Sequence, residues 1–216
     1  MEIELSRRTL LRGVAGASLA VGAGLYTATP ALAVPAPAIT GCAGWNARPA
    51  KSTPQLLDHK PTVLVVHQTE TPNSTDLSKA HAFSLARSIQ NHHMNNNGWI
   101  DSGQQFTISR GGHVLEGRHR SLSALKGGKQ HLLGAHVGGH NTTHIGIENE
   151  GTYHTVTPPD QLWASLVAMC AYICQQYGIK VANIKGHRDY NATDCPGNKL
   201  YSMLPKLRQD VSKLLG

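Results

Sequence analysis

Apolar residues recur along this chain in short runs and helical stripes separated by polar turns. Residues 61–66 form an apolar run rich in β-branched side chains, which predicts a buried strand. Residues 105–109 alternate, Gly111-Gly112 turns the chain, and residues 113–116 return, so a hairpin is expected. The apolar stretch 143–151 predicts a further strand that ends near the same crevice.

The first long helical stripe covers Asp76 to Asn95. Its apolar side chains recur at helical spacing, and Thr75 or Asn73 can cap its N-terminus.

A second helix is marked by its ends: Thr157 is the expected cap, Pro158 the first helical residue and Gly178 the terminator. Its apolar stripe is typical of a core helix. A last amphipathic segment runs from Lys199 to Leu215, and Pro205 should open or kink it.

The N-terminal residues have the pattern of an export signal. Ser6 to Leu11 contains two adjacent arginines, an uncharged Ala/Gly-rich run extends from Gly13 to Tyr26, and Ala31-Leu32-Ala33 resembles a cleavage site. The uncharged run is shorter than the ~20 residues that span a bilayer, so no stable membrane anchor is expected. We therefore expect a twin-arginine signal peptide over residues 1–33, and a protein that is secreted or located in the cell wall.

The remaining residues suit a single domain. Residues 34–41 are Pro/Ala-rich and predict a mobile leader, and residues 42–216 form the expected domain. Without residues 1–33, the chain carries 17 Lys and Arg against 11 Asp and Glu, a formal net charge of +6. This balance favours association with anionic polymers such as a cell wall. The basic residues are scattered, which argues against nucleic acid as a partner. Oligomeric state is not indicated.

Candidate metal chemistry appears near the C-terminus, where His187 and Cys195 lie eight residues apart on a loop that ends in Pro196-Gly197. An imidazole and a thiolate together suit a borderline-soft ion, above all Zn²⁺. A catalytic zinc needs three protein ligands. His67 is the candidate third ligand, because it follows the buried strand 61–66 and should point into the crevice at the sheet edge.

The sequence has four cysteines, and three remain for disulfide pairing if Cys195 binds a metal. With Cys195 as a metal ligand, Cys42 is expected to form a disulfide with either Cys170 or Cys174 in an oxidising compartment. A bridge between Cys170 and Cys174, one helical turn apart, is the alternative.

Several short motifs now occur in one order, and together they resemble a known family. They are Trp45 to Pro49, Val66-His67-Gln68-Thr69, Trp99-x-Asp101-x-Gly103, Glu116-Gly117-Arg118, Ala135-His136, Ile145-Gly146-Ile147 and Gly186-His187…Cys195-Pro196-Gly197. Over residues 42–205 the chain is similar to the zinc-dependent N-acetylmuramoyl-L-alanine amidases and peptidoglycan recognition proteins.

The resemblance implies an α/β fold, with a central mixed sheet flanked by helices and a peptidoglycan groove on one face. It implies that His67, His187 and Cys195 bind zinc. It also implies cleavage of the amide between the lactyl group of N-acetylmuramic acid and L-alanine, with peptidoglycan or muropeptides as partners.

The sequence departs from the family at Gln104, where many members carry a catalytic Tyr. Gln has no phenolic proton and cannot act as a base, so Gln104 is assigned here to substrate binding. Glu148 matches the catalytic Glu of the cytoplasmic anhydro-muropeptide amidases, which also lack the Tyr. A carboxylate beside a zinc-bound water is a reasonable general base, although a structural carboxylate is the alternative. Glu150 lies two residues after Glu148, on the same face if the strand continues, and is the second candidate for the general base.

Three further residues are assigned by the resemblance. Thr193, two residues before Cys195, is expected to steady the oxyanion, or else to be a simple turn residue. His136 and Asn141 fall where family members contact the muropeptide, and Asn141 could instead brace its loop. Two functions therefore compete: a zinc amidase, favoured by the intact Cys195, and a peptidoglycan-binding module with little or no turnover, favoured by Gln104.

Overall fold

The computed structural model describes residues 33–216. The twin-arginine motif and the uncharged run lie outside the described residues, as does all of the expected signal peptide except Ala33. None of the helices within residues 33–216 is long and apolar enough to cross a membrane.

The centre of the domain is a six-stranded mixed sheet in the order β1-β5-β4-β7-β3-β8, and β2 pairs with β6 in a separate two-stranded sheet. β4 and β5 are antiparallel, and the other pairs of the large sheet are parallel. The strands are β1 (Ile39–Thr40), β2 (Leu56–Leu57), β3 (Val63–Gln68), β4 (Phe106–Ile108), β5 (Val114–Glu116), β6 (His131–Leu132), β7 (His144–Asn149) and β8 (Ile184–Gly186).

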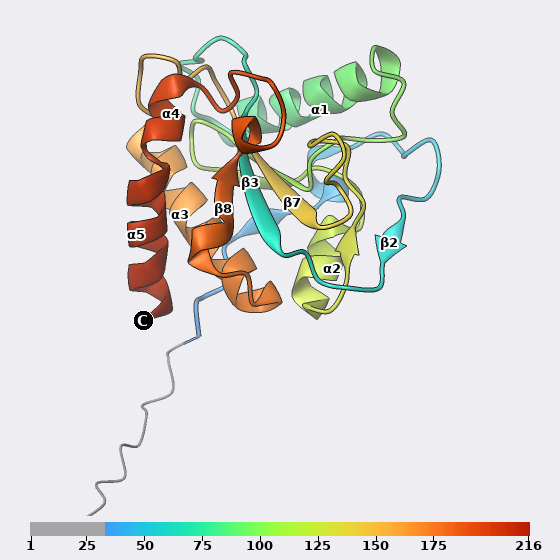
Figure 1. Ribbon diagram of the computed structural model, residues 1–216. Coiled ribbons are helices and arrows are strands. Elements are labelled where there is room, and N and C mark those ends of the chain that lie inside the picture. Colours follow the sequence, from blue (N-terminus) through green and yellow to red (C-terminus); the bar gives the residue numbers. More distant parts are fainter. Residues whose placement is uncertain (1–32) are drawn as a thin grey trace, which may run out of the picture. The chain divides into compact units, whose positions relative to one another are not determined.

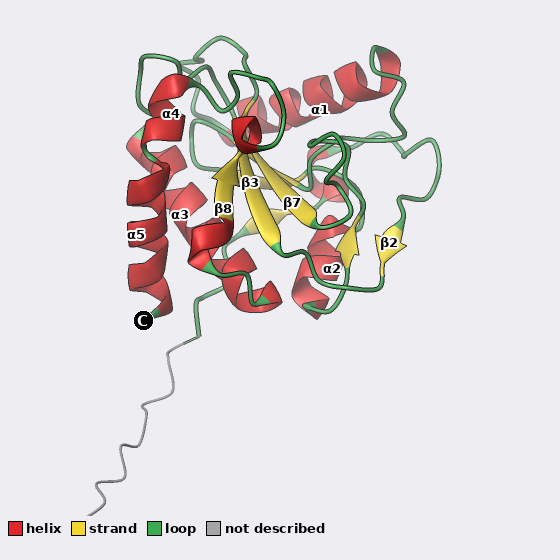
Figure 2. Cartoon of the chain, viewed as in Figure 1, coloured by secondary structure: helices red, strands yellow, loops and turns green. Residues whose placement is uncertain are grey.

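Helices flank this sheet on both sides, and the predicted fold class is confirmed (Figures 1 and 2). They are α1 (Lys79–Asn95), α2 (Ser121–Gly127), α3 (Asp160–Tyr177), α4 (Asn198–Ser202) and α5 (Leu204–Leu215), with short 3₁₀ turns η1 (Cys42–Trp45), η2 (Val181–Asn183) and η3 (His187–Asp189). The main core lies where α3 and α5 pack against the sheet. A smaller cluster joins α1, η1 and β5.

The helix ends differ from the sequence prediction. α1 begins at Lys79 rather than Asp76, and its cap is Ser78, whose hydroxyl accepts a hydrogen bond from His81 N. Asp76 instead accepts a hydrogen bond from Ser78 N, which holds the preceding residues in a turn. α3 begins at Asp160 after Pro159, so neither Thr157 nor Pro158 caps or opens it, whereas Gly178 ends it as predicted. Pro205 lies in the first turn of α5.

The predicted disulfide is wrong. All four cysteines are free thiols. Cys42 packs in the small cluster with Trp45, whereas Cys170 and Cys174 are buried in the main core. Cys42 therefore lies in a different cluster from Cys170 and Cys174.

The Pro/Ala-rich segment is attached to the domain, which corrects the expectation of a mobile leader. Val34 is buried in the main core, and its backbone N–H donates to Gln175 Oε1 over 2.6 Å. Ile39 and Thr40 form β1, which pairs with β5. These contacts fix residues on both sides of the proline-containing stretch.

Candidate metal-binding and catalytic site

The candidate site lies at the carboxyl edge of three parallel strands. In register, His67 of β3 pairs with Glu148 of β7, and Glu148 pairs with Thr107 of β4. Side chains of directly paired residues point to the same face of a sheet. β8 ends at Gly186, so His187 emerges beside the tip of β3. Figure 2 shows these strands converging on the short helical turn that follows β8. The parallel pairing therefore brings His67, Glu148 and His187 together.

The three predicted ligands meet there. One ligand atom from each of His67, His187 and Cys195 lies within 4.8 Å of the others, and this is the group within residues 33–216 that could hold a metal ion. His67 Nδ1 is 3.6 Å from Cys195 Sγ, and the His67 and His187 rings are 4.6 Å apart between centroids.

The hydrogen bonds behind the two imidazoles orient their free nitrogens. His67 Nε2 lies 3.0 Å from His136 Nδ1, and His187 Nε2 lies 3.1 Å from Asn191 Oδ1. The amide oxygen of Asn191 only accepts, so His187 carries its proton on Nε2. His136 Nε2 faces His144 O at 3.4 Å, which leaves His136 Nδ1 as the acceptor for His67. Both imidazoles thus present an unprotonated Nδ1 to the cluster.

Gly146 makes room for this support. A Cβ at Gly146 would lie 2.7 Å from His136 Nδ1, so the imidazole of His136 packs directly on the backbone of β7. His136 was predicted to contact the muropeptide. It lines the same hollow, but its ring nitrogens are engaged with His67 and His144, so the structure places it behind a candidate ligand.

Burial keeps the three candidate ligands uncharged. It lowers the pKa of His67 well below its ordinary value, with the neighbouring His136 and His187 adding to the effect, and it lowers the pKa of His187. It raises the pKa of Cys195 to about 12, partly offset by the N–H of Gln68. Both imidazoles are therefore ready to donate lone pairs, while the thiol keeps its proton until a cation lies beside it.

Glu148 lines the same hollow of about 240 Å³ as the three candidate ligands. Burial raises the pKa of its carboxyl to about 8. Within residues 33–216, no backbone or side-chain group donates a hydrogen bond to that carboxyl. This isolation disfavours the alternative of a structural carboxylate, which would be tied to backbone amides.

Glu150 has the opposite environment. Its carboxylate accepts hydrogen bonds from His81 Nε2 at 2.6 Å and Arg110 N at 2.7 Å, and the residue is almost fully buried. Glu150 therefore joins α1 to the end of β7 and does not line the hollow. Its second-ranked assignment as a base is wrong, because both oxygens are already used.

Two other predicted residues reach the hollow. Gln104 is buried; its Nε2 donates to Thr107 Oγ1 over 2.8 Å, and its Oε1 has no hydrogen-bond partner. Thr193 lines the hollow and accepts a hydrogen bond from Cys195 N at 3.2 Å. Thr193 thus acts as a turn residue while its side chain borders the site.

Asn141 braces its own loop. Its Oδ1 accepts from the backbone N–H groups of His136 and Val137, and its Nδ2 donates to Val137 O. Oδ1 and one N–H of Nδ2 are thus engaged within the loop, which fits the alternative of a bracing residue. Contact of Asn141 with a muropeptide stays a prediction.

The sequence did not single out His93 as a site residue. His93 stacks on Trp99 at 4.7 Å between ring centroids, its Nδ1 accepts from Gly103 N, and both rings line the hollow. Its position near the end of α1, close to the Trp99 motif, was the available signal. Only the fold brings the helix end over the strand tips.

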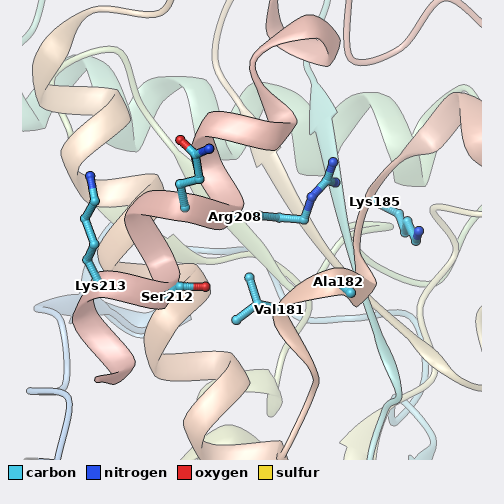
Figure 3. Close-up of a pocket in the computed structure, with 7 residues that line it drawn as sticks. Val181, Ala182, Lys185, Arg208, Ser212 and Lys213 are labelled. Atoms are coloured by element: carbon cyan, nitrogen blue, oxygen red, sulfur yellow. The ribbon is translucent and has the colours of Figure 1, made fainter.

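A larger hollow of about 730 Å³ lies elsewhere, between α5 and the η2–β8 segment (Figure 3). Lys185, Arg208 and Lys213 are among its lining residues. It has no ligating or nucleophilic cluster, and Arg208 already donates to Ile184 O. Chemistry is therefore assigned to the smaller hollow at the strand tips.

Fold and site together define a mixed α/β domain with a His/His/Cys donor cluster and a carboxyl group in one groove. The sequence profile described as N-acetylmuramoyl-L-alanine amidase matches residues 57–198. The chain therefore belongs to the N-acetylmuramoyl-L-alanine amidase and peptidoglycan recognition protein family.

Individual relatives agree with this membership. The chain is 31% identical to a human N-acetylmuramoyl-L-alanine amidase over 78% of its own length, but spans only 28% of that relative. It is 32% identical to peptidoglycan recognition protein 1 of Bos indicus, covering 74% of this chain and 78% of the relative. Among solved structures, a point mutant of Drosophila PGRP-LB in complex with tracheal cytotoxin matches with a TM-score of 0.66 and 26% identity, covering 77% of this chain and 92% of the other.

Proposed function

We propose that this protein is a zinc-dependent amidase that cleaves the bond between N-acetylmuramic acid and L-alanine in peptidoglycan or its fragments. The observation that carries the proposal is the convergence of His67, His187 and Cys195 in one hollow with the isolated carboxyl of Glu148. Family membership supports the reaction class but includes proteins named only for recognition.

The donor set fits zinc. Tetrahedral Zn²⁺ with typical bond lengths places a nitrogen and a sulfur ligand about 3.6 Å apart, and His67 Nδ1 and Cys195 Sγ are 3.6 Å apart. His136 and Asn191 fix the outer nitrogens of the two imidazoles, as partners of metal-ligating histidines commonly do. Three protein ligands leave the open position of a catalytic site.

Zinc bound there would supply a nucleophilic water at neutral pH and would polarise the substrate carbonyl. Glu148 would accept a proton from the attacking water and deliver it to the leaving amine of L-alanine. Its carboxyl suits this exchange because it lines the same hollow as the candidate ligands and, within residues 33–216, no protein group donates a hydrogen bond to it. Thr193, at the rim, is proposed to contact the substrate carbonyl.

A peptidoglycan-binding module with little turnover is the second candidate, and Gln104 favours it. Gln104 lines the hollow where a phenol would supply a proton, and an amide cannot do so. A binding module needs the groove but not a titratable Glu148, so the two functions make different predictions for that residue.

The decisive experiment incubates purified wall fragments with the protein and measures new L-alanine amino termini. Release that a chelator abolishes and added zinc restores is the expected result. Glu148→Gln should abolish release while leaving the muropeptide Kd within about threefold. Binding without release by the wild-type protein at full zinc loading would favour the recognition module instead.

We also propose that the protein acts outside the cytoplasm. The arginine pair and the small-residue site after it support export, and the net positive charge of the exported part supports retention at an anionic wall. Mass measurement of the protein from the culture medium tests this, with removal of residues 1–33 as the expected result.

A further inference from the structure

The groove continues past the metal-binding cluster into a second hollow of about 270 Å³, here called the side pocket. Glu148 and His93 line both hollows, so the two are neighbours. The polar residues Thr69, Thr71, Ser88 and His92 line the side pocket, together with Leu85 and Ile89 from α1. The Thr69 hydroxyl is already bonded to Thr71 Oγ1 and Gly151 N. This lining offers hydrogen bonds for amides and apolar contacts for methyl groups.

Neither hollow is lined by a lysine or an arginine within residues 33–216. The basic side chains of the surrounding elements are held elsewhere. Lys79 lies over the Phe83 ring, Arg87 donates to Trp45 O, Arg110 donates to Ser74 O, and Arg118 donates to Ser102 O. The two carboxylic acids that line the hollows are Glu148 and Glu70.

His93, which lines both hollows, adds no positive charge. Burial lowers the pKa of His93 to about 4, helped by His92 and Arg118, and its Nδ1 accepts from Gly103 N. The groove therefore contrasts with the net positive charge of the chain. A ligand carboxylate in the side pocket would lose water without gaining a lysine or an arginine as a partner, which is unfavourable.

We propose that the side pocket binds the peptide limb of the substrate and selects stems that are uncharged near the scissile bond. This inference rests on the proposed function. The only carboxylates of a muropeptide are on its peptide limb, and the second stem residue carries either a free carboxylate or, when amidated, a carboxamide. The aliphatic and hydroxyl lining suits the carboxamide form. Stems with D-isoglutamine are therefore preferred to stems with D-glutamate.

The test compares two synthetic muropeptides that differ only in this group, at pH 8, where an ordinary imidazole is neutral. The expected kcat/KM ratio of amide over acid is about tenfold or more. A ratio near one, or a preference for the acid, overturns the proposal.

A charge-introducing variant locates the effect. Ser88→Arg places a cation at the side pocket from an exposed position of α1. Ser84→Arg makes the same change one turn earlier, at an exposed position outside the pocket. Ser88→Arg should lower the amide-over-acid ratio at least about threefold by improving the acid, because the carboxylate gains a partner. Ser84→Arg should leave the ratio unchanged.

The remaining outcomes are also decisive. A high wild-type ratio that Ser88→Arg does not change overturns the assignment to the side pocket. If neither muropeptide is cleaved, the proposed hydrolysis fails, but the ratio of the two dissociation constants from calorimetry, in wild type and both variants, tests the same selectivity independently.

Discussion

Replacing Glu148 by Gln should lower activity and raise stability at the same time. Gln has the same shape but cannot exchange a proton, so loss of the general base should reduce kcat by about 10²–10⁴-fold. A structural carboxylate would behave differently. Replacing it with a neutral amide would weaken the hydrogen bonds that backbone N–H groups donate to it and would lower stability. The paired measurement therefore separates the two readings of Glu148.

The stability gain follows from the raised pKa. An ordinary carboxyl, as in the unfolded chain, has a pKa of 4.5, and the folded value is about 8. Between these values the folded state holds a proton that the unfolded state releases, so stability is lost as pH rises through this window. The full shift sets a ceiling of about 5 kcal/mol at alkaline pH. Water in the open groove reduces the expected effect to about 1–2 kcal/mol.

The assay is thermal unfolding of the metal-free protein from pH 5 to pH 9, with wild type and Glu148→Gln side by side. The Tm difference should be near zero at pH 5 and reach about 2–8 °C in favour of the variant at pH 9. Asp160→Asn, which removes an exposed carboxylate at the start of α3, should show no such growth with pH. A Glu148→Gln variant that is less stable than wild type at pH 9 refutes the reasoning.

Three further variants test the site and its support. His67→Ala should lower bound zinc, measured by atomic absorption, from about one per chain to near zero while circular dichroism stays unchanged; a full zinc complement would remove His67 from the ligand set. His136→Phe keeps an aromatic ring but removes the acceptor for His67 Nε2, so chelator competition should show zinc binding about 10–100-fold weaker, and an unchanged affinity would make His136 only a packing residue. Asp101→Ala should destabilise the protein by about 3 kcal/mol in urea titrations, because Gln90 Nε2, Ser102 N and both His119 N and Nδ1 lose their common acceptor; a change below about 1 kcal/mol would contradict that role.

The strands and the candidate ligands could be predicted because their signals are local. The β-branched run before His67 marks a buried strand, and the parallel pairing of β3 with β7 and β8 then places His67, Glu148 and His187 at one edge. Parallel strands give this result whatever the loops between them do.

The errors arose where long-range packing decides. Cys42 and Cys170 are both buried, but the sequence cannot say that they belong to different cores. Glu148 and Glu150 alternate along one stretch, yet β7 ends at Asn149, and beyond it Glu150 turns to His81. The side pocket also escaped prediction, because Thr71 and Ser88 become neighbours only when α1 crosses the strand tips.

Gln104 changes the number of proton carriers in the groove rather than its shape. A chain with a phenol at this position has two groups that can exchange a proton beside the metal cluster. Here the amide of Gln104 cannot exchange one, Thr193 is a hydroxyl, and His93 is neutral at working pH with Nδ1 engaged. Glu70 also lines the hollow, but it is exposed and its carboxylate lies 3.6 Å from His154 Nε2. We therefore assign the proton transfer of the proposed hydrolysis to Glu148. Activity that survives Glu148→Gln, with the pH dependence of a second titrating group, would mean that another residue carries protons.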